Sequence, residues 1–158
     1  MGLDMHFNIE VERFATEPVR RYGPMKLRLD GATMQYGFQY FRKFNALHGW
    51  MVDNVQGGKD DCETHPIMKA HWEELLQVCE SVLYGSSIGE DVFPTTEGCF
   101  FGSTDYDGYY FSAVEKTIEM CTTALAIIED PKKELGDILS DHPGLAVASF
   151  RFTYYASW

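Results

Sequence analysis

The sequence has no apolar run long enough to cross a membrane. A transmembrane helix needs about 18 to 20 consecutive apolar residues, and no stretch of the 158 residues reaches that length. The opening segment, MGLDMHFNIE, lacks the basic region followed by an apolar region that marks a secretory signal. We therefore expect a cytoplasmic protein without a membrane partner.

Positive charge is scarce. Lysine and arginine total 13 against 24 aspartates and glutamates, which gives a net charge of −11. Nucleic-acid binding depends on cations that neutralise phosphates, and the best basic clusters, Arg20 with Arg21 and Arg42 with Lys43, are small. Direct nucleic-acid binding is not expected, and the acidity is more typical of a solubility feature than of nucleic-acid mimicry.

Paired cysteine motifs and familiar catalytic signatures are also missing. The four cysteines, at positions 62, 79, 99 and 121, are scattered, which predicts reduced thiols. His65 and His71 are six residues apart and would not face the same way on one helix, so we expect neither a structural metal nor a cofactor. No phosphate-binding loop, G-x-G-x-x-G motif or nucleophile elbow occurs, and the common hydrolase and nucleotide-hydrolysing classes have no support.

Aromatic residues are abundant. They make up 15% of the chain, with eleven Phe, nine Tyr and three Trp. A small core rarely needs so many, so some of them should line a concave surface or an interface between subunits. A homo-oligomer whose subunits share a site therefore stays open.

The hydrophobic patterns predict an α+β fold in a single domain, residues 1–158. Alternation predicts strands over 3–14, 25–29 and 146–158 and a short strand over 99–102, with a turn at Asp30 and Gly31. Apolar spacings of three and four predict helices over 38–55, 66–83 and 106–128, with Pro66 in the first turn of the second. We expect a mostly antiparallel sheet that pairs the N- and C-terminal strands, with about three amphipathic helices packed on it.

The segment GCFFGSTDYDGYYF, residues 98–111, joins the predicted short strand to the third helix. Ser103, Thr104 or Asp105 can cap this helix, and Asp107 in its first turn suits the helix dipole. Three tyrosines, at 106, 109 and 110, cannot all share the core stripe that begins at position 111. At least one should project beside the helix N-terminus, which favours a planar, partly anionic ligand.

Two neighbouring segments carry further polar groups. In FRKFNALHGW, Arg42, Asn45 and His48 recur every three residues along one side of the predicted helix. They are either a hydrogen-bonded helix packed against loops or part of a site. In KDDCETH, Asp60 and Asp61 could serve acid–base chemistry, and Cys62 could serve as a nucleophile beside a histidine, although a solvated loop explains the same residues.

Several long segments match one family in order. MGLDM, FRKFNALHGWMVDNVQGGKDDC, FPTTEGCFFGSTDYDGYYF and the terminal YYASW resemble a family of small bacteriophage and prophage proteins. Cys99 stands where an aromatic is usual, and Gly108 where an acidic residue is usual. The resemblance supplies no activity. It implies a phage-encoded accessory protein in the cytoplasm of the bacterial host, of a kind that often acts on host defence.

Three functions remain open. The first is binding of a small, planar, polar ligand such as a nucleotide or a nucleotide-derived defence signal, which would thereby be sequestered. The second is an enzyme acting on a nucleotide-like substrate, with His48, Asp61 and Cys62 as catalytic candidates alongside Asp60. The third is an acidic inhibitor of a host defence protein.

For the first function, the sequence predicts cations that contact phosphate, an aromatic ring that stacks on a base, and polar side chains that hydrogen-bond to the edge of the ligand. Arg42 and Lys43 would meet phosphate, and Tyr106, Tyr109 or Trp50 would stack on a base. Asn45, Asp61 and Asp107 would read polar edges. The full predicted set of ligand-binding residues is Arg42, Lys43, Asn45, His48, Trp50, Asp60, Asp61, Ser103, Thr104, Tyr106, Asp107 and Tyr109.

Overall fold

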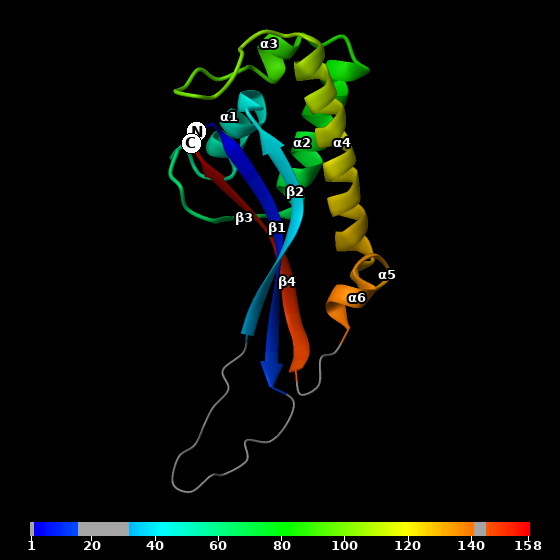
Figure 1. Ribbon diagram of the computed structural model, residues 1–158. Coiled ribbons are helices and arrows are strands. Elements are labelled where there is room, and N and C mark those ends of the chain that lie inside the picture. The colour runs from blue at the N-terminus through cyan, green and yellow to red at the C-terminus, as the bar shows by residue number, and fades with distance from the viewer. Residues whose placement is uncertain (1, 16–31, 141–144) are drawn as a thin grey trace, which may run out of the picture.

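The computed structural model has an α+β fold and describes residues 2–15, 32–140 and 145–158 (Figure 1). Four antiparallel strands form one sheet in the order β2-β1-β4-β3. The strands are β1 (Asp4–Ala15), β2 (Ala32–Arg42), β3 (His65–Ile67) and β4 (Leu145–Ser157). The predicted pairing of the N- and C-terminal strands is confirmed, because β1 pairs with β4 from Asp4 to Ala15. On its other side, β1 pairs with β2 from Asp4 to Arg13.

Helices cover one face of this sheet. The longer helices are α1 (Asn45–Asn54), α2 (Lys69–Leu83) and α4 (Gly108–Glu129), and the single-turn helices are α3 (Gly89–Val92), α5 (Pro131–Glu134) and α6 (Gly136–Leu139). In Figure 1, α2 and α4 lie side by side along the sheet. No helix in the described ranges is long and apolar enough to span a membrane.

Strand alternation decides which side chains enter the core. Phe7, Ile9 and Val11 of β1 are buried, as are Phe152 and Tyr154 of β4. Their neighbours on the opposite face are polar, which is the pattern of a sheet with one packed face. Trp72 of α2 is fully buried among rings from three strands, and it fixes the helix layer to the sheet.

The buried face of β1 continues to Arg13, which follows Val11 by two residues and is also buried. A β-bulge in β4 shifts the register between Glu12 and Arg13, which pair with Ser149 and Val147. The Arg13 guanidinium donates hydrogen bonds to the carbonyl oxygens of Ile138 and, at 3.1 Å, Ser140. Arg13 therefore ties the end of α6 to the sheet.

The predicted helix over 38–55 is wrong in its first part. Residues up to Arg42 pair with β1, and Lys43, with φ of 56°, separates the strand from α1. The three-and-four spacing that included Tyr40 was coincidental, since that side chain is 42% exposed. The predicted strand over 25–29 and the turn at Asp30 and Gly31 lie outside the described residues.

Three smaller boundaries also differ. Pro66 lies in the edge strand β3, where a missing N–H is tolerated, and α2 begins three residues later. No strand forms over 99–102, because Phe100 and Gly102 both have positive φ. The predicted third helix begins at Gly108 rather than at position 106. Its core stripe is confirmed at Val114 and Cys121, although Phe111 is 41% exposed.

Candidate functional site

The end of β2 meets the segment 98–107 at a close backbone crossing. Lys43 N donates to Leu3 O at 2.8 Å, and Leu3 N donates to Phe100 O at 3.3 Å. Gly102 has φ of +97°, and a Cβ there would lie 2.9 Å from Lys43 Cβ. A side chain at position 102 would therefore push the two segments apart, so glycine is what allows the crossing.

A surface depression of about 450 Å³ lies at this crossing. Its lining residues are Arg42, Lys43, Gly102, Ser103 and Tyr109. Four of these five are in the predicted ligand-binding set, and the missed member is the glycine that lets the backbones approach. The structure thus brings together residues that are up to 67 positions apart in the chain.

The depression carries two exposed cations. The Arg42 side chain is 58% exposed, and its Nε lies 3.7 Å from Asp4 Oδ1. Lys43 is exposed and forms no ion pair with any residue the structure describes. Both side chains lie over Gly2, whose ideal Cβ would be 3.1 Å from Lys43 Cε and 3.6 Å from Arg42 Nη2. The two positive charges therefore converge in a chain whose net charge is −11.

Tyr109 supplies an aromatic wall. Its ring is 55% exposed, and its hydroxyl donates a hydrogen bond to the carbonyl oxygen of Arg42. Partial burial, followed by the negative charge of Asp107, raises the pKa of Tyr109 above its ordinary value. The hydroxyl therefore stays protonated and holds α4 against the end of β2.

The start of α4 is capped by Asp107, and the predicted cap at Ser103, Thr104 or Asp105 is wrong. Asp107 Oδ1 accepts hydrogen bonds from Tyr109 N at 2.9 Å and Tyr110 N at 3.1 Å. This is the usual N-cap arrangement of a helix. Ser103 and Asp105 instead form a local turn, in which the Ser103 hydroxyl donates to Asp105 Oδ2 at 2.9 Å.

Tyr106 and Thr104 face a different loop. The Tyr106 hydroxyl accepts a hydrogen bond from Thr95 N at 3.1 Å, and the Thr104 carbonyl accepts one from Thr95 Oγ1 at 3.1 Å. Tyr106 lines a separate depression of about 280 Å³ with Val82 and Ile88 among others. Of the three tyrosines at this junction, Tyr109 is thus the one that reaches the cationic depression.

Asn45 is a buried connector between loops. Only 2% of the residue is exposed, and its Nδ2 donates to Ser103 O at 2.8 Å and to Phe101 O at 3.3 Å. Its Oδ1 accepts from Thr96 N at 3.1 Å. The Asn45 amide is therefore committed to protein backbone and positions Ser103 at the depression.

His48 lies between two polar side chains, Tyr154 and Asp60, beneath the sheet. Its Nδ1 is hydrogen-bonded to the Tyr154 hydroxyl at 2.8 Å, and its Nε2 lies 3.0 Å from Asp60 Oδ1. The second contact is within ion-pair range. His48 is 1% exposed, whereas the Asp60 side chain is 38% exposed. Of these three polar side chains, the Asp60 carboxylate is therefore the one that reaches solvent.

The remaining predicted residues do not converge on His48. Asp61 Oδ1 lies 2.7 Å from His65 Nε2, and this contact lowers the pKa of Asp61. Cys62 is exposed, and Trp50 packs against the core. In the described part of the chain, no group of three His, Cys, Asp or Glu side chains has a geometry that could hold a metal ion.

Because the His48 imidazole is buried, we expect the folded state to lose stability at acidic pH. Burial lowers the pKa of His48 below its ordinary value of 6.5, and the charge of Asp60 opposes this shift only in part. At a pH between the two pKa values, the His48 imidazole is therefore protonated in the unfolded chain and neutral in the folded chain. The stabilisation is fully present above the unfolded-state pKa and is lost as pH falls toward the folded-state pKa.

We expect the free energy of unfolding of the wild type to fall between pH 7 and pH 5, and His48→Gln to show a flatter profile. Urea unfolding at pH 7.5, 6.0 and 5.0 measures this slope. Asp61 contributes at lower pH, because its ordinary pKa is 3.8 and its folded-state pKa is lower still. Parallel profiles for the two proteins would contradict the assignment to His48.

Comparison with known proteins found no match: no family model, no curated protein and no solved structure is similar to this chain. The assignment of a function therefore rests on the geometry of the depression. The sequence did not reveal two residues: Gly102, which lines the depression, and Tyr154, which is hydrogen-bonded to His48. A signal for Tyr154 was present, since the alternation of its strand places a polar hydroxyl on the buried face.

Proposed function

We propose that the protein binds a small phosphate-bearing ligand, a nucleotide or nucleotide-derived signal, at the depression lined by Arg42, Lys43 and Tyr109. The observation that supports this most is the convergence of two exposed cations beside an exposed tyrosine ring. Arginine suits bidentate contacts with phosphate oxygens, and lysine adds a compact positive charge. The Tyr109 ring offers a face on which a base can stack.

The lining of the depression favours binding of the ligand without its chemical conversion. None of the five lining residues is a carboxylate, a histidine or a cysteine. The best acid–base pair, His48 with Asp60, has its imidazole almost completely buried. In the bacteriophage setting that the family resemblance implies, holding a nucleotide signal would lower its free concentration in the host.

A thermal-shift screen tests the proposal. The purified protein is mixed with mono-, di- and cyclic nucleotides and NAD, and each mixture is then analysed by mass spectrometry. We expect at least one phosphate-bearing compound to raise the melting temperature and to be recovered intact, with a smaller rise at 500 mM than at 50 mM salt. A consumed ligand would favour the enzyme based on His48, and no shift with any compound would favour a host protein as the partner.

A pair of substitutions at Tyr109 tests the stacking role. Tyr109→Phe removes the hydrogen bond to the Arg42 carbonyl but keeps the ring, whereas Tyr109→Ala removes both. Base–aromatic stacking contributes about 1–3 kcal/mol, so the alanine variant should bind a nucleotide found in the screen roughly tenfold or more weakly. Isothermal titration calorimetry compares the variants, and an alanine variant that binds as tightly as the phenylalanine variant would exclude stacking on Tyr109.

A further inference from the structure

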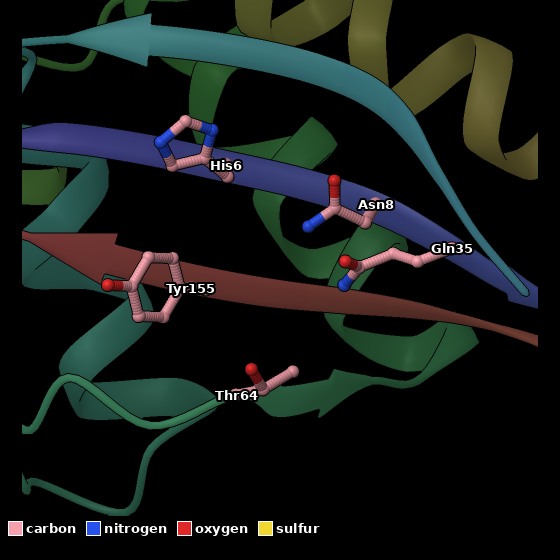
Figure 2. Close-up of a pocket in the computed structure, with 5 residues that line it drawn as sticks. All are labelled: His6, Asn8, Gln35, Thr64 and Tyr155. Atoms are coloured by element: carbon pink, nitrogen blue, oxygen red, sulfur yellow. The ribbon is translucent and has the colours of Figure 1, made fainter. Parts of the chain in front are cut away.

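The sheet face away from α2 and α4 carries another depression, of about 390 Å³ (Figure 2). Three strands and the loop before β3 contribute to it. Its lining residues are His6 and Asn8 from β1, Gln35 from β2, Tyr155 from β4 and Thr64 from the loop. In Figure 2, the side chains of Asn8 and Gln35 lie next to each other, with Tyr155 and His6 farther along the strands.

The lining of this depression is polar but contains no carboxylate, lysine or arginine. Within the described residues, none of its five side chains makes a hydrogen bond or an ion pair with the protein. His6 makes only ring contacts, with centroid distances of 5.2 Å to Tyr40 and 6.0 Å to Tyr155. Two amides, two hydroxyls and an imidazole thus remain available to a ligand.

Thr153 adds a buried group to the same face. It is paired with Asn8 on one side and Pro66 on the other, and it precedes Tyr155 by two residues, so both project to this face. The residue is 2% exposed, and its Oγ1 has no hydrogen-bond partner among the described residues. Buried hydroxyls of this kind are uncommon in folded proteins, which makes the position notable.

We propose that this depression binds an uncharged, polyhydroxylated ligand, namely a sugar ring. The amides of Asn8 and Gln35 can both donate and accept, as adjacent sugar hydroxyls require. Tyr155 offers an apolar ring with a polar tip, which suits a ligand with an apolar and a hydroxylated side. The nearby charges of Asp4 and Glu10 are paired with Arg42 and Arg151, and the lining itself carries no charged side chain, which favours an uncharged ligand.

This site is independent of the proposed nucleotide site. The two depressions share no lining residue. Binding of an uncharged sugar should change less than twofold between 50 and 500 mM salt, unlike binding of a phosphate-bearing ligand. A variant with Arg42→Ala and Lys43→Ala should bind sugar normally, so the failure of either proposal can be recognised separately.

An NMR titration tests the sugar site. The 15N-labelled protein is titrated with glucose, galactose, mannose, N-acetylglucosamine, maltose and cellobiose up to tens of millimolar. We expect at least one sugar to shift the side-chain amide signals of Asn8 and Gln35 in a saturable way. The double variant Asn8→Ala with Gln35→Ala should weaken that binding about tenfold or more.

Two single variants complete the test, one inside the depression and one outside it as the control. Gln35→Ala alone changes an exposed position and should weaken binding while leaving the backbone spectrum intact. Thr33→Ala, also exposed on β2, lies outside the depression and should leave binding unchanged. The proposal would be overturned if no sugar shifts the two amides, or if a sugar shifts the backbone signals of β1 and β4 equally in the wild type and the double variant.

Discussion

Asn45→Leu is expected to lower the free energy of unfolding by about 2–4 kcal/mol. Leucine has a similar volume but cannot donate hydrogen bonds to the carbonyls of Phe101 and Ser103. It also cannot accept one from the N–H of Thr96. Leaving a buried polar group without its partner costs about 1–3 kcal/mol. Since several groups lose a partner together, the total should exceed that of a typical substitution.

The same change should also weaken ligand binding, because Asn45 holds Ser103 at the depression. Urea unfolding gives the stability, and calorimetry with a nucleotide from the screen gives the affinity. Asn54→Ala is a matched control, since Asn54 is exposed and its amide bonds only Trp50 O within its own helix. If the two variants lost equal stability, the connecting role of Asn45 would be excluded.

Trp72→Ala is expected to cost about 3–5 kcal/mol of unfolding free energy. The side chain is fully buried, and its ring centroid lies 5.3 Å from Phe152, 6.1 Å from Phe7 and 6.3 Å from Phe38. Removing it leaves a cavity where α2 meets three strands. Domains have only about 5–15 kcal/mol of stability in total, so the variant should unfold at much lower urea concentrations.

Trp72→Phe separates packing from hydrogen bonding. The Trp72 Nε1 has no hydrogen-bond partner in the described structure, so phenylalanine loses volume but no bond. It should retain most of the stability that alanine loses. Tyr84→Ala removes an aromatic that is 76% exposed and should change stability by less than about 0.5 kcal/mol. A phenylalanine variant as unstable as the alanine variant would point to a cause other than ring packing.

The N- and C-terminal strands and the helices α2 and α4 could be predicted because their patterns are regular. The alternation of Phe7, Ile9 and Val11 marks β1, and the spacing of Trp72, Leu75 and Cys79 marks α2. The end of β2 could not be predicted, because Tyr40 and Phe41 also fit a helical spacing with Leu47 and Val52 of α1. Only pairing with β1, a contact between distant segments, decides between the two patterns.

The candidate site could be predicted in part. Arg42, Lys43, Ser103 and Tyr109 were in the predicted set, and the structure places them around one depression. Asn45 and His48 were identified as polar groups on an apolar helix, but spacing does not reveal that their partners are backbone groups and Tyr154. The depression of Figure 2 was missed because its residues are spread over three strands and a loop and form no local motif.

The most direct test of the proposed function is a calorimetric titration of the double variant Arg42→Ala with Lys43→Ala. Its control is Lys132→Ala with Lys133→Ala, which makes the same change in charge on the exposed helix α5. Hydrogen bonds to charged groups contribute about 1.5–3 kcal/mol each. The account therefore predicts that the first variant loses at least a hundredfold in affinity for a nucleotide from the screen while the control stays within about threefold of the wild type. Equal affinity in both variants would contradict phosphate binding by Arg42 and Lys43.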